Sequence, residues 1–162
     1  MSIVAARIHT LKDNFALDTF IVKGPNLAVY DDPHTLARFE TELGELLSGA
    51  RDVDEQVRRR LRYLKPHHRA APLPRKPRAV IANQISRKYS VIEIWAADRV
   101  GLLYDITRTM AALGLDIDSA KISTEGKMAV NVFYVSDGGG GGKIEDPQRQ
   151  QQVTAALEPV IA

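Results

Sequence analysis

The sequence predicts an α+β fold in which an antiparallel sheet carries helices on one face. Three observations lead to this fold class. A strand, turn, strand, loop and helix pattern occurs twice within the 162 residues. Within Met128–Val135, apolar residues fill both faces of a segment rich in Val, Phe and Tyr, which is typical of a strand. Ahead of that strand, apolar residues recur at helical spacing, which indicates an amphipathic helix that packs on a sheet.

The repeat relates "IVAARIHTLKDNFALDTFIVKG" at Ile3–Gly24 to "IDSAKISTEGKMAVNVFYVSDG" at Ile117–Gly138. In each copy, two strand-like segments rich in β-branched and aromatic residues flank a turn signal. The turn is "KDN" at Lys12–Asn14 in the first copy and "EG" at Glu125-Gly126 in the second.

Each copy continues into a helix that begins at an Asp-Pro pair. Asp32 and Asp146 are expected N-caps, because a carboxylate accepts hydrogen bonds from the free amides of the first turn. Proline suits the first helical position, since its missing N–H has no partner there in any case. The first copy therefore predicts the strands Ile3–Thr10 and Ala16–Val22, followed by a capped helix.

The second copy is preceded by a further strand and helix. "YSVIEIWAA" at Tyr89–Ala97 predicts a strand, Asp98 is an expected N-cap, and Gly114 is expected just beyond the end of the helix. The second unit thus has the order β-α-β-β-α, whereas the first copy begins at the second strand. We therefore expect the chain to be a fragment, or its start to lie inside a domain. The apolar stripe of this helix is formed by Leu102, Leu103, Ile106, Met110 and Leu113.

A basic segment connects the two copies. Arg51–Arg78 holds ten Lys or Arg against three acidic residues, so it carries +7 and leaves −5 for the remainder of a chain with net charge +2. "RAVIAN" at Arg78–Asn83 predicts a strand that completes the first unit. A helical stripe precedes it at Val53, Val57, Leu61 and Leu64. The expected division is a partial first domain at 1–50, a proline-containing linker at 51–77, the last strand of the first unit at 78–85 and a second domain at 86–162.

Composition narrows the possible functions. The chain has no cysteine, no apolar run of the roughly 20 residues that span a bilayer, and no secretory signal, so we expect a cytoplasmic protein. The Gly-Ser and Asp-x-Asp pattern of nucleotidyltransferases and the His-Asp pair of metal-dependent phosphohydrolases do not occur. "GGGGGK" lacks the first Gly and the final Ser or Thr of a phosphate loop. We expect neither a catalytic nor a metal site on this chain.

The β-α-β-β-α order with its "DRVGLL" loop resembles the ACT domain, a small-molecule-sensing module of amino-acid metabolism. Asp98–Asp137 is similar to the last ACT domain of the bacterial PII-protein uridylyltransferase/uridylyl-removing enzymes, and Ile3–Gly24 is similar to the second half of the ACT domain before it. The linker that ends in "RAVIANQISRKYSVIEI" fits the same resemblance. The implied fold is ferredoxin-like, βαββαβ. Val100 stands where this family usually has proline.

The resemblance implies a regulatory region. In such an enzyme it would sense L-glutamine as an allosteric ligand, and it would reach the PII signalling protein through the catalytic domains. A Mg²⁺ or Mn²⁺ cofactor would belong to those domains, and none is expected on this chain. ACT domains usually work in pairs, so ACT–ACT pairing or a homo-oligomer is expected. The face of Met128–Val135 that helices leave uncovered is the expected contact.

The candidate ligand site is the loop before the first helix of the second unit. A helix N-terminus offers free N–H groups and partial positive charge, which suit an α-carboxylate. Gly101 permits close approach, and Asp98 either pairs with an α-ammonium group or is only a helix cap. The resemblance implies a ligand at the same loop. The expected ligand-binding residues are Asp98, Arg99, Val100, Gly101, Leu102, Leu103, Ile117, Asp118 and Ser119.

Two alternatives stay open. The first is a free-standing ACT protein that binds another amino acid or only mediates oligomerisation. The second, less favoured, is an adaptor that binds nucleic acid through its basic segment. Competition by a small amino acid would support the first, and salt-dependent binding to DNA or RNA would support the second.

Overall fold

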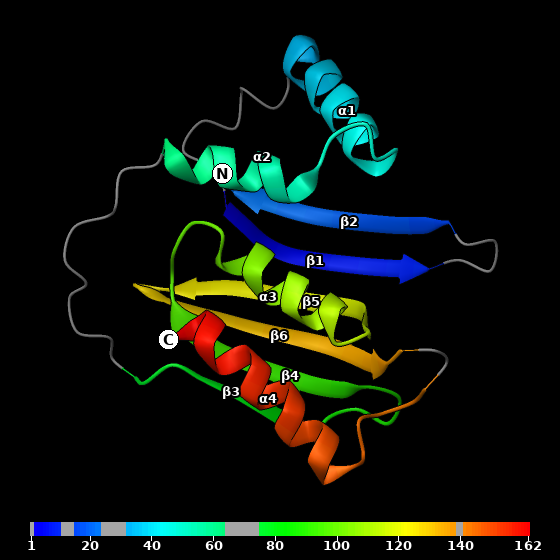
Figure 1. Ribbon diagram of the computed structural model, residues 1–162, viewed down its shortest axis with the longest axis vertical. Helices are drawn as coiled ribbons and strands as arrows, with labels where there is room; N and C mark the ends of the chain where they lie inside the picture. Colours follow the sequence, from blue (N-terminus) through cyan, green and yellow to red (C-terminus); the bar gives the residue numbers. More distant parts are fainter. Residues whose placement is uncertain (1, 11–14, 24–31, 64–74, 139–140) are drawn as a thin grey trace. The chain divides into compact units, whose positions relative to one another are not determined.

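The computed structural model describes residues 2–10, 15–23, 32–63, 75–138 and 141–162 of the chain. These residues form six strands and four helices (Figure 1). None of the described helices is long and apolar enough to cross a membrane. In chain order the elements are β1 (Ser2–Thr10), β2 (Ala16–Lys23), α1 (Pro33–Leu47), α2 (Val53–Arg62), β3 (Arg78–Ala82), β4 (Ser90–Ala97), α3 (Leu102–Ala112), β5 (Leu115–Glu125), β6 (Met128–Asp137) and α4 (Pro147–Ile161).

The chain divides into two compact units. One spans residues 23–70 and holds α1 and α2, while the other comprises residues 2–22 and 71–162 and holds the sheet with α3 and α4. The strands of the first sequence repeat therefore belong to the unit that contains the second repeat. The division differs from the expected one because β1 and β2 extend the sheet of the second domain.

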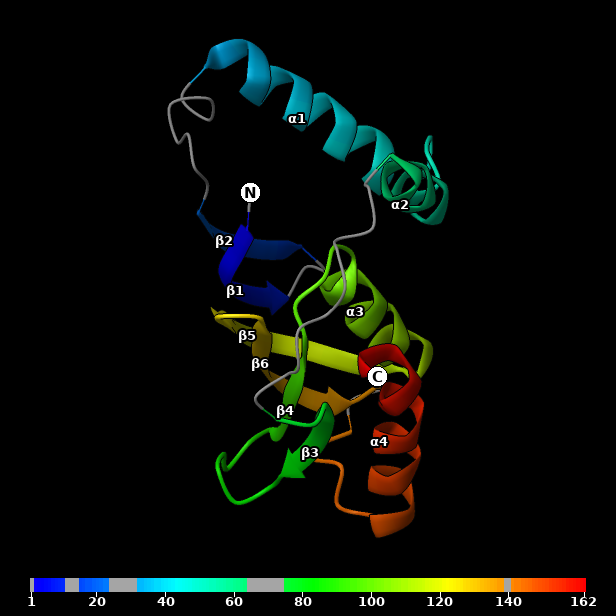
Figure 2. The same cartoon turned by 90° about the vertical axis from the view of Figure 1, so that its left-hand side faces the viewer.

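The six strands form one sheet in the order β2-β1-β5-β6-β4-β3. The pairs β1–β5, β5–β6, β6–β4 and β4–β3 are antiparallel. Figure 2 shows α3 and α4 on the same face of this sheet. The predicted fold class, an antiparallel sheet with helices on one face, is confirmed.

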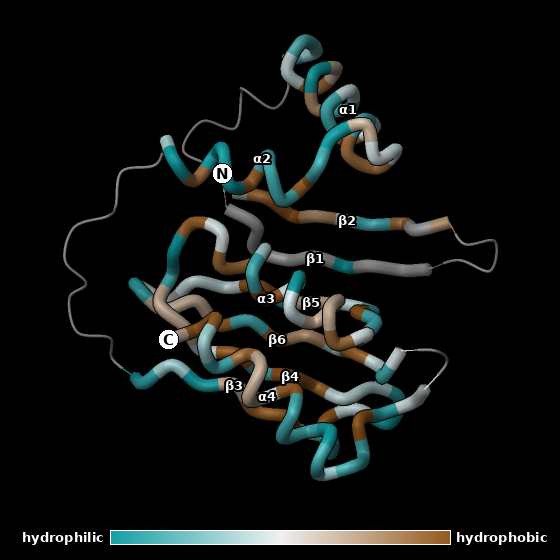
Figure 3. Tube along the Cα trace, in the orientation of Figure 1, coloured by the Kyte–Doolittle hydropathy of each residue, from teal (hydrophilic) through white to brown (hydrophobic). Residues whose placement is uncertain are grey.

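The core lies between the sheet and these two helices. The predicted stripe of α3 is confirmed, because its members are buried or pack against the buried cluster. Each side chain of this size contributes about 1.5–3 kcal/mol when it leaves water. In α4, the first turns are hydrophilic, and the residues that reach the core come later in the helix (Figure 3). The buried residues of the two helices are Leu102, Ile106 and Met110 from α3, and Val153, Leu157 and Ile161 from α4.

Of the four residues predicted to cap or end a helix, Asp32, Asp146 and Gly114 do so, and Asp98 does not. Asp32 accepts a hydrogen bond from the Thr35 amide at 3.0 Å and caps α1. Asp146 accepts one from the Gln148 amide at 3.0 Å and caps α4. Gly114 follows α3 with a φ of 71°, in the left-handed region that glycine enters without a penalty. The turn at Lys12–Asn14 lies outside the described residues.

β3 was expected to complete the first unit, but it pairs with β4 of the second. Its residues Ala79 and Ile81 are partly buried against the core cluster, and α4 packs on it. The sequence could not separate the two outcomes, because a short apolar strand before a turn fits the edge of either unit. β3 thus takes an edge position of the sheet next to the first strand of the second domain.

The seam between β1 and β5 relates the two repeats. Ala6 lies opposite Ala120, which is also its counterpart in the sequence repeat. Ala5 lies opposite Lys121, the counterpart of Arg7. A strand that pairs with its own counterpart in this way does so about a local two-fold axis, as in an isologous interface. The axis passes between Ala6 and Ala120.

The elements of the first repeat leave apolar side chains exposed. On β2, the outer strand of the sheet, Phe20 is 51% and Ile21 is 57% exposed. On α1, Phe39 is 58% and Leu47 is 80% exposed. By contrast, Phe133, the counterpart of Phe20 in the second repeat, is buried, and Tyr134, the counterpart of Ile21, is half-buried. Among the described residues, β2 and α1 thus leave apolar side chains in contact with solvent.

Candidate functional site

The candidate loop connects β4 to α3. β4 ends at Ala97, which pairs with Met128 of β6, and the amide of Asp98 still donates to the carbonyl of Lys127 at 2.9 Å. The chain then turns over Gly101 into the helix. Asp98 is thus fixed by the last hydrogen bond of the sheet.

Asp98 does not cap α3, contrary to the expectation. The N-cap is Gly101, with a φ of 82°, and no side chain makes a capping hydrogen bond. The left-handed glycine delays the helix until Leu102, so the carboxylate of Asp98 lies too far back along the chain to reach the first turn. In this structure the N-cap of α3 is therefore Gly101 and not Asp98.

The loop presents a free carboxylate beside an uncapped helix. Asp98 and Val100 are exposed, and no side-chain partner of Asp98 occurs among the described residues. The first amides of α3 carry the partial positive charge of a helix N-terminus. The Asp98 carboxylate suits a positively charged group, and the helix N-terminus suits a negatively charged one. The two together complement a ligand that carries both charges, such as a zwitterion.

The other expected residues of the loop have different surroundings. Leu102 is 4% exposed and belongs to the core, and Leu103 packs partly buried against it, so both contribute to a site through their backbone alone. Arg99 is committed to protein groups: its Nη2 lies 2.6 Å from Asp105 Oδ2 and donates to the carbonyl of Val160 at 3.1 Å.

The second half of the expected site lies at the opposite end of the sheet. Ile117 pairs with Val135, which is level with Ser90 at the start of β4, whereas the loop follows Ala97 at the end of β4. The seven steps from Ser90 to Ala97 correspond to about 23 Å along the strand. The second unit by itself therefore does not bring the loop and Ile117–Ser119 together.

Asp118 occupies an irregularity that the sequence did not predict. The register of β5 shifts between Ile117 and Ser119, which leaves Asp118 as an extra residue of the strand. The hydroxyl of Tyr89 donates a hydrogen bond to Asp118 Oδ1. Ile117 packs partly buried against the core. The bulge therefore ties the start of β5 to the residue before β4.

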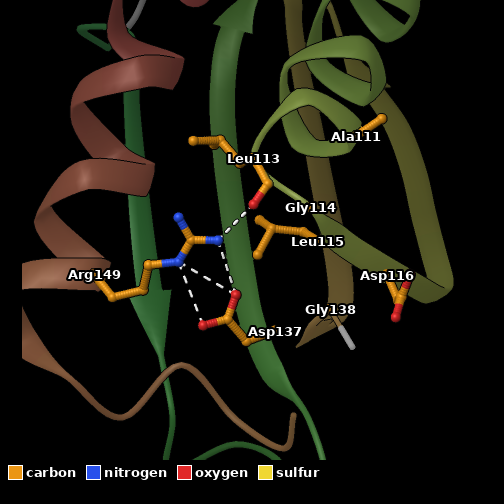
Figure 4. Close-up of a pocket in the computed structure, with 8 residues that line it drawn as sticks. All are labelled: Ala111, Leu113, Gly114, Leu115, Asp116, Asp137, Gly138 and Arg149. Carbon is orange, nitrogen blue, oxygen red and sulfur yellow. Dashed lines mark hydrogen bonds and ion pairs between the residues drawn. The ribbon is translucent and has the colours of Figure 1, made fainter. Parts of the chain in front are cut away.

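A cleft that the sequence did not indicate lies at the same end of the sheet (Figure 4). It has a volume of about 540 Å³ and forms where α3 ends, β5 begins and β6 ends. Two carboxylates line the cleft. Asp137 pairs with Arg149, whereas Asp116 is exposed and has no side-chain partner among the described residues. Its lining residues are Ala111, Leu113, Gly114, Leu115, Asp116, Asp137, Gly138 and Arg149.

Arg149 of α4 lines this cleft and is held there by several hydrogen bonds. Its Nε and Nη2 donate to both oxygens of Asp137 at 2.9–3.3 Å, and its Nη2 also donates to the Leu113 carbonyl (Figure 4). Its Nη1 donates to Gln152 at 2.7 Å. The hydrogen bond to Asp137 raises the pKa of the Arg149 guanidinium. With its donors so occupied, Arg149 joins α4 to the ends of α3 and β6.

Comparison with known proteins gives a consistent set of relatives. A family model described as "ACR9-like, ACT-like domain" matches residues 78–161, slightly more than half of the chain. A bifunctional uridylyltransferase/uridylyl-removing enzyme of Gluconobacter oxydans is 41% identical over 157 residues, which are 96% of this chain and 16% of that protein. Proteins of the same name from Bradyrhizobium diazoefficiens and Rhodospirillum rubrum are 38% and 34% identical, over 99% of this chain and 17% of their own length.

The chain thus spans about a sixth of the length of these curated relatives. No solved structure matches it.

Proposed function

Because the chain belongs to the ACT-like domain family, we propose that it is the regulatory, amino-acid-binding region of a bifunctional uridylyltransferase/uridylyl-removing enzyme. The observation that carries the proposal is the exposed carboxylate of Asp98 beside the uncapped N-terminus of α3. Transfer and removal of uridylyl groups on the PII protein would reside in the rest of a longer protein. The chain itself would bind the signal.

The proposed ligand is L-glutamine. Its α-carboxylate would accept hydrogen bonds from amides of the first turn of α3 beyond Leu102, because the Leu102 amide already donates to the carbonyl of Arg99 at 3.2 Å and no side chain caps the helix. Its α-ammonium group would donate a charge-assisted hydrogen bond to Asp98. Glutamate would add a second carboxylate near Asp98 and bind less well. Asp116 does not contribute to this discrimination, because it pairs with Ser136 at the far end of the sheet.

The two-fold seam supports a site of two parts. Ala5 lies opposite Lys121, which is level with Glu93 of β4. Because β1 and β5 are antiparallel, the residues before Ala5 lie nearer the end of the sheet at which β4 leads into the Asp98–Leu103 loop. Residues 3–5 are the repeat counterparts of Ile117–Ser119. The start of β1 would therefore supply, across the seam, the strand that the second unit cannot bring to its own loop.

A ligand at this position regulates only through differential affinity. Glutamine shifts the balance between two arrangements of the catalytic domains by the difference in its binding free energy to each. A coupling of about 1–3 kcal/mol is typical of such regulation. The proposed function therefore requires the loop to differ between the two arrangements.

Titration calorimetry on the 162-residue chain tests the proposal. We expect sub-millimolar binding of L-glutamine and weaker binding of L-glutamate. Asp98→Ala should weaken glutamine by about 1.5–3 kcal/mol, the contribution of a hydrogen bond to a charged group. Asp116→Ala, an exposed carboxylate at the other end of β5, is the matched control and should leave the affinity unchanged.

Two results would contradict the proposal. The absence of binding by any free amino acid removes the sensing function. Binding that Asp98→Ala leaves intact, or that Asp116→Ala weakens instead, moves the site away from the loop and toward the cleft of Figure 4.

A further inference from the structure

We propose that Arg99 is a positioning residue that ties the Asp98–Leu103 loop to the C-terminus of α4, so that occupancy of the loop is transmitted to that helix. The transmission rests on the proposed amino-acid site. The tie itself depends on no ligand and is tested separately.

One guanidinium joins three segments of the chain. Nη2 of Arg99 lies 2.6 Å from Oδ2 of Asp105 on α3 and donates to the carbonyl of Val160 on α4 at 3.1 Å. Nη1 donates to the carbonyl of Val100 within the loop at 3.4 Å. The loop, the first turns of α3 and the end of α4 therefore meet at this side chain.

The end of α4 requires such a partner. The last carbonyls of a helix have no intrahelical donor, and a cation there also interacts favourably with the helix dipole. Pro159 lies in the last turn and has no N–H, so this turn holds fewer backbone hydrogen bonds than an ordinary one. The amide of Ala162, which follows the helix, donates to the carbonyl of Glu158 at 3.2 Å. Arg99 supplies a donor from outside the helix.

The two ends of α4 are held with different strength. At its start, Arg149 donates to Asp137 and to Leu113, and its side chain is 23% exposed. At its end, the side chain of Arg99 is 41% exposed, so solvent screens its ion pair more strongly. The C-terminal tie is the weaker one, and it is the one that the ligand loop controls.

The loop is placed to act on this tie. Arg99 follows Asp98 directly and precedes the helix cap Gly101 by two positions, so its backbone lies between the two groups proposed to hold the ligand. A zwitterion bound to both would fix the backbone of Arg99 and thereby its guanidinium. The last turn of α4 would then open less often.

Hydrogen exchange of the 162-residue chain, followed by mass spectrometry, tests the tie and the transmission. Arg99→Ala should speed the exchange of amides in the last turn of α4 about two- to fivefold, the range of a helix-terminus interaction. Arg99→Lys should keep more protection than Arg99→Ala, because the lysine ammonium retains the positive charge but cannot contact Val100, Asp105 and Val160 at once as the planar guanidinium does. The amide of Gln150, in the first turn of α4, should not change.

Arg38→Ala is the matched control, because Arg38 forms an exposed ion pair with Glu42 at 3.8 Å within a single helix. It should leave α4 unaffected. Saturating L-glutamine should slow the exchange of the last turn of α4 in the wild type and have no effect there in Arg99→Ala.

The outcomes are distinguishable. Unchanged exchange at the end of α4 in Arg99→Ala overturns the tie. Faster exchange in this variant, with no change at the end of α4 when glutamine is added to the wild type, supports the tie and overturns the transmission, whereas the absence of glutamine binding in calorimetry counts against the proposed function. Glutamine protection that is the same in the wild type and in Arg99→Ala supports the proposed function and overturns the transmission.

Discussion

Gly138 lies so close to Gly114 that a Cβ atom on Gly138 would stand 2.0 Å from the Gly114 carbonyl oxygen. Both contacting groups are backbone, so neither can move aside as a side chain would. Gly138→Ala should therefore destabilise the sheet-containing unit by about 2–3 kcal/mol, the cost of forcing an extra methyl into a packed site. Urea unfolding followed by the fluorescence of Trp95, the single tryptophan of the chain, measures this.

Gly142→Ala is the control for this prediction, because a Cβ there meets no atom within 4 Å and its φ is not in the left-handed region. It should change stability by less than about 0.5 kcal/mol. If Gly138→Ala changes stability as little as Gly142→Ala does, Gly138 is not in contact with the backbone of Gly114.

Asn131 carries a buried amide oxygen without a hydrogen-bond partner among the described residues. It is 2% exposed and lies between Ile94 and Ile122 of the neighbouring strands. Asn131→Leu should stabilise the fold by about 1 kcal/mol, because it removes a polar group that is desolvated and unpaired. Differential scanning calorimetry compares it with Gln84→Leu, an exposed position where we expect no gain.

Asn131→Asp gives the same test a pH dependence. Burial would raise the pKa of the new carboxyl, so the variant is least stable at neutral pH and regains stability as the pH falls. A loss of stability with Asn131→Leu would mean that the amide oxygen has a partner, and pH-independent stability of Asn131→Asp relative to the wild type would mean that the site is not desolvated.

Asp32 titrates below its ordinary pKa of 3.8, mainly because the Thr35 hydroxyl donates to its carboxylate. A lowered folded-state pKa stabilises the ionised form, so the cap supports α1 above pH 4 and this support is lost as the pH falls through the folded-state value. Thr35→Val should raise the pKa of Asp32 toward 3.8. Carbon-13 NMR titration of the carboxyl group measures the shift.

Thr41→Val is the matched control, since its hydroxyl donates to the carbonyl of Ala37 and does not reach Asp32. An unchanged pKa of Asp32 in Thr35→Val would assign the lowering to the backbone amides of the first turn.

β2 is the outer strand of the sheet and carries the exposed side chains of Phe20 and Ile21. An apolar outer strand pairs readily with another chain, so we expect self-association that grows with protein concentration. Ile21→Lys should reduce it, because a charge on an edge opposes strand addition. Val80→Lys on β3, the opposite edge, should have the smaller effect. Light scattering across a concentration series decides, and a monodisperse wild-type monomer throughout would refute the expectation.

The helices and most strands followed from local rules. The stripe from Leu102 to Leu113, the cap at Asp146 and the left-handed Gly114 depend on residues within a few positions of one another, and each appears in the structure. Such features are readable because the sequence that encodes them is contiguous.

The site was harder to predict because its parts are not contiguous. The cap rule selected Asp98, but the left-handed conformation of Gly101 moved the helix start beyond its reach. The bulge at Asp118 and the contacts of Arg99 with Val160 depend on partners far along the chain. Only the fold brings these groups together, so no pattern of spacing in one segment contains them.

The local two-fold axis between Ala6 and Ala120 has a consequence for stoichiometry. Strands that meet about such an axis in separate molecules come apart on dilution, but β1 and β5 belong to one polypeptide, and tethering gives them a fixed effective concentration. Their counterpart positions are also free to diverge, as Arg7 and Lys121 have done. Because the paired positions can diverge, the two sides of the seam do not have to present equal ligand sites, and the ligand site proposed at Asp98–Leu103 needs no identical copy across β1 and β5.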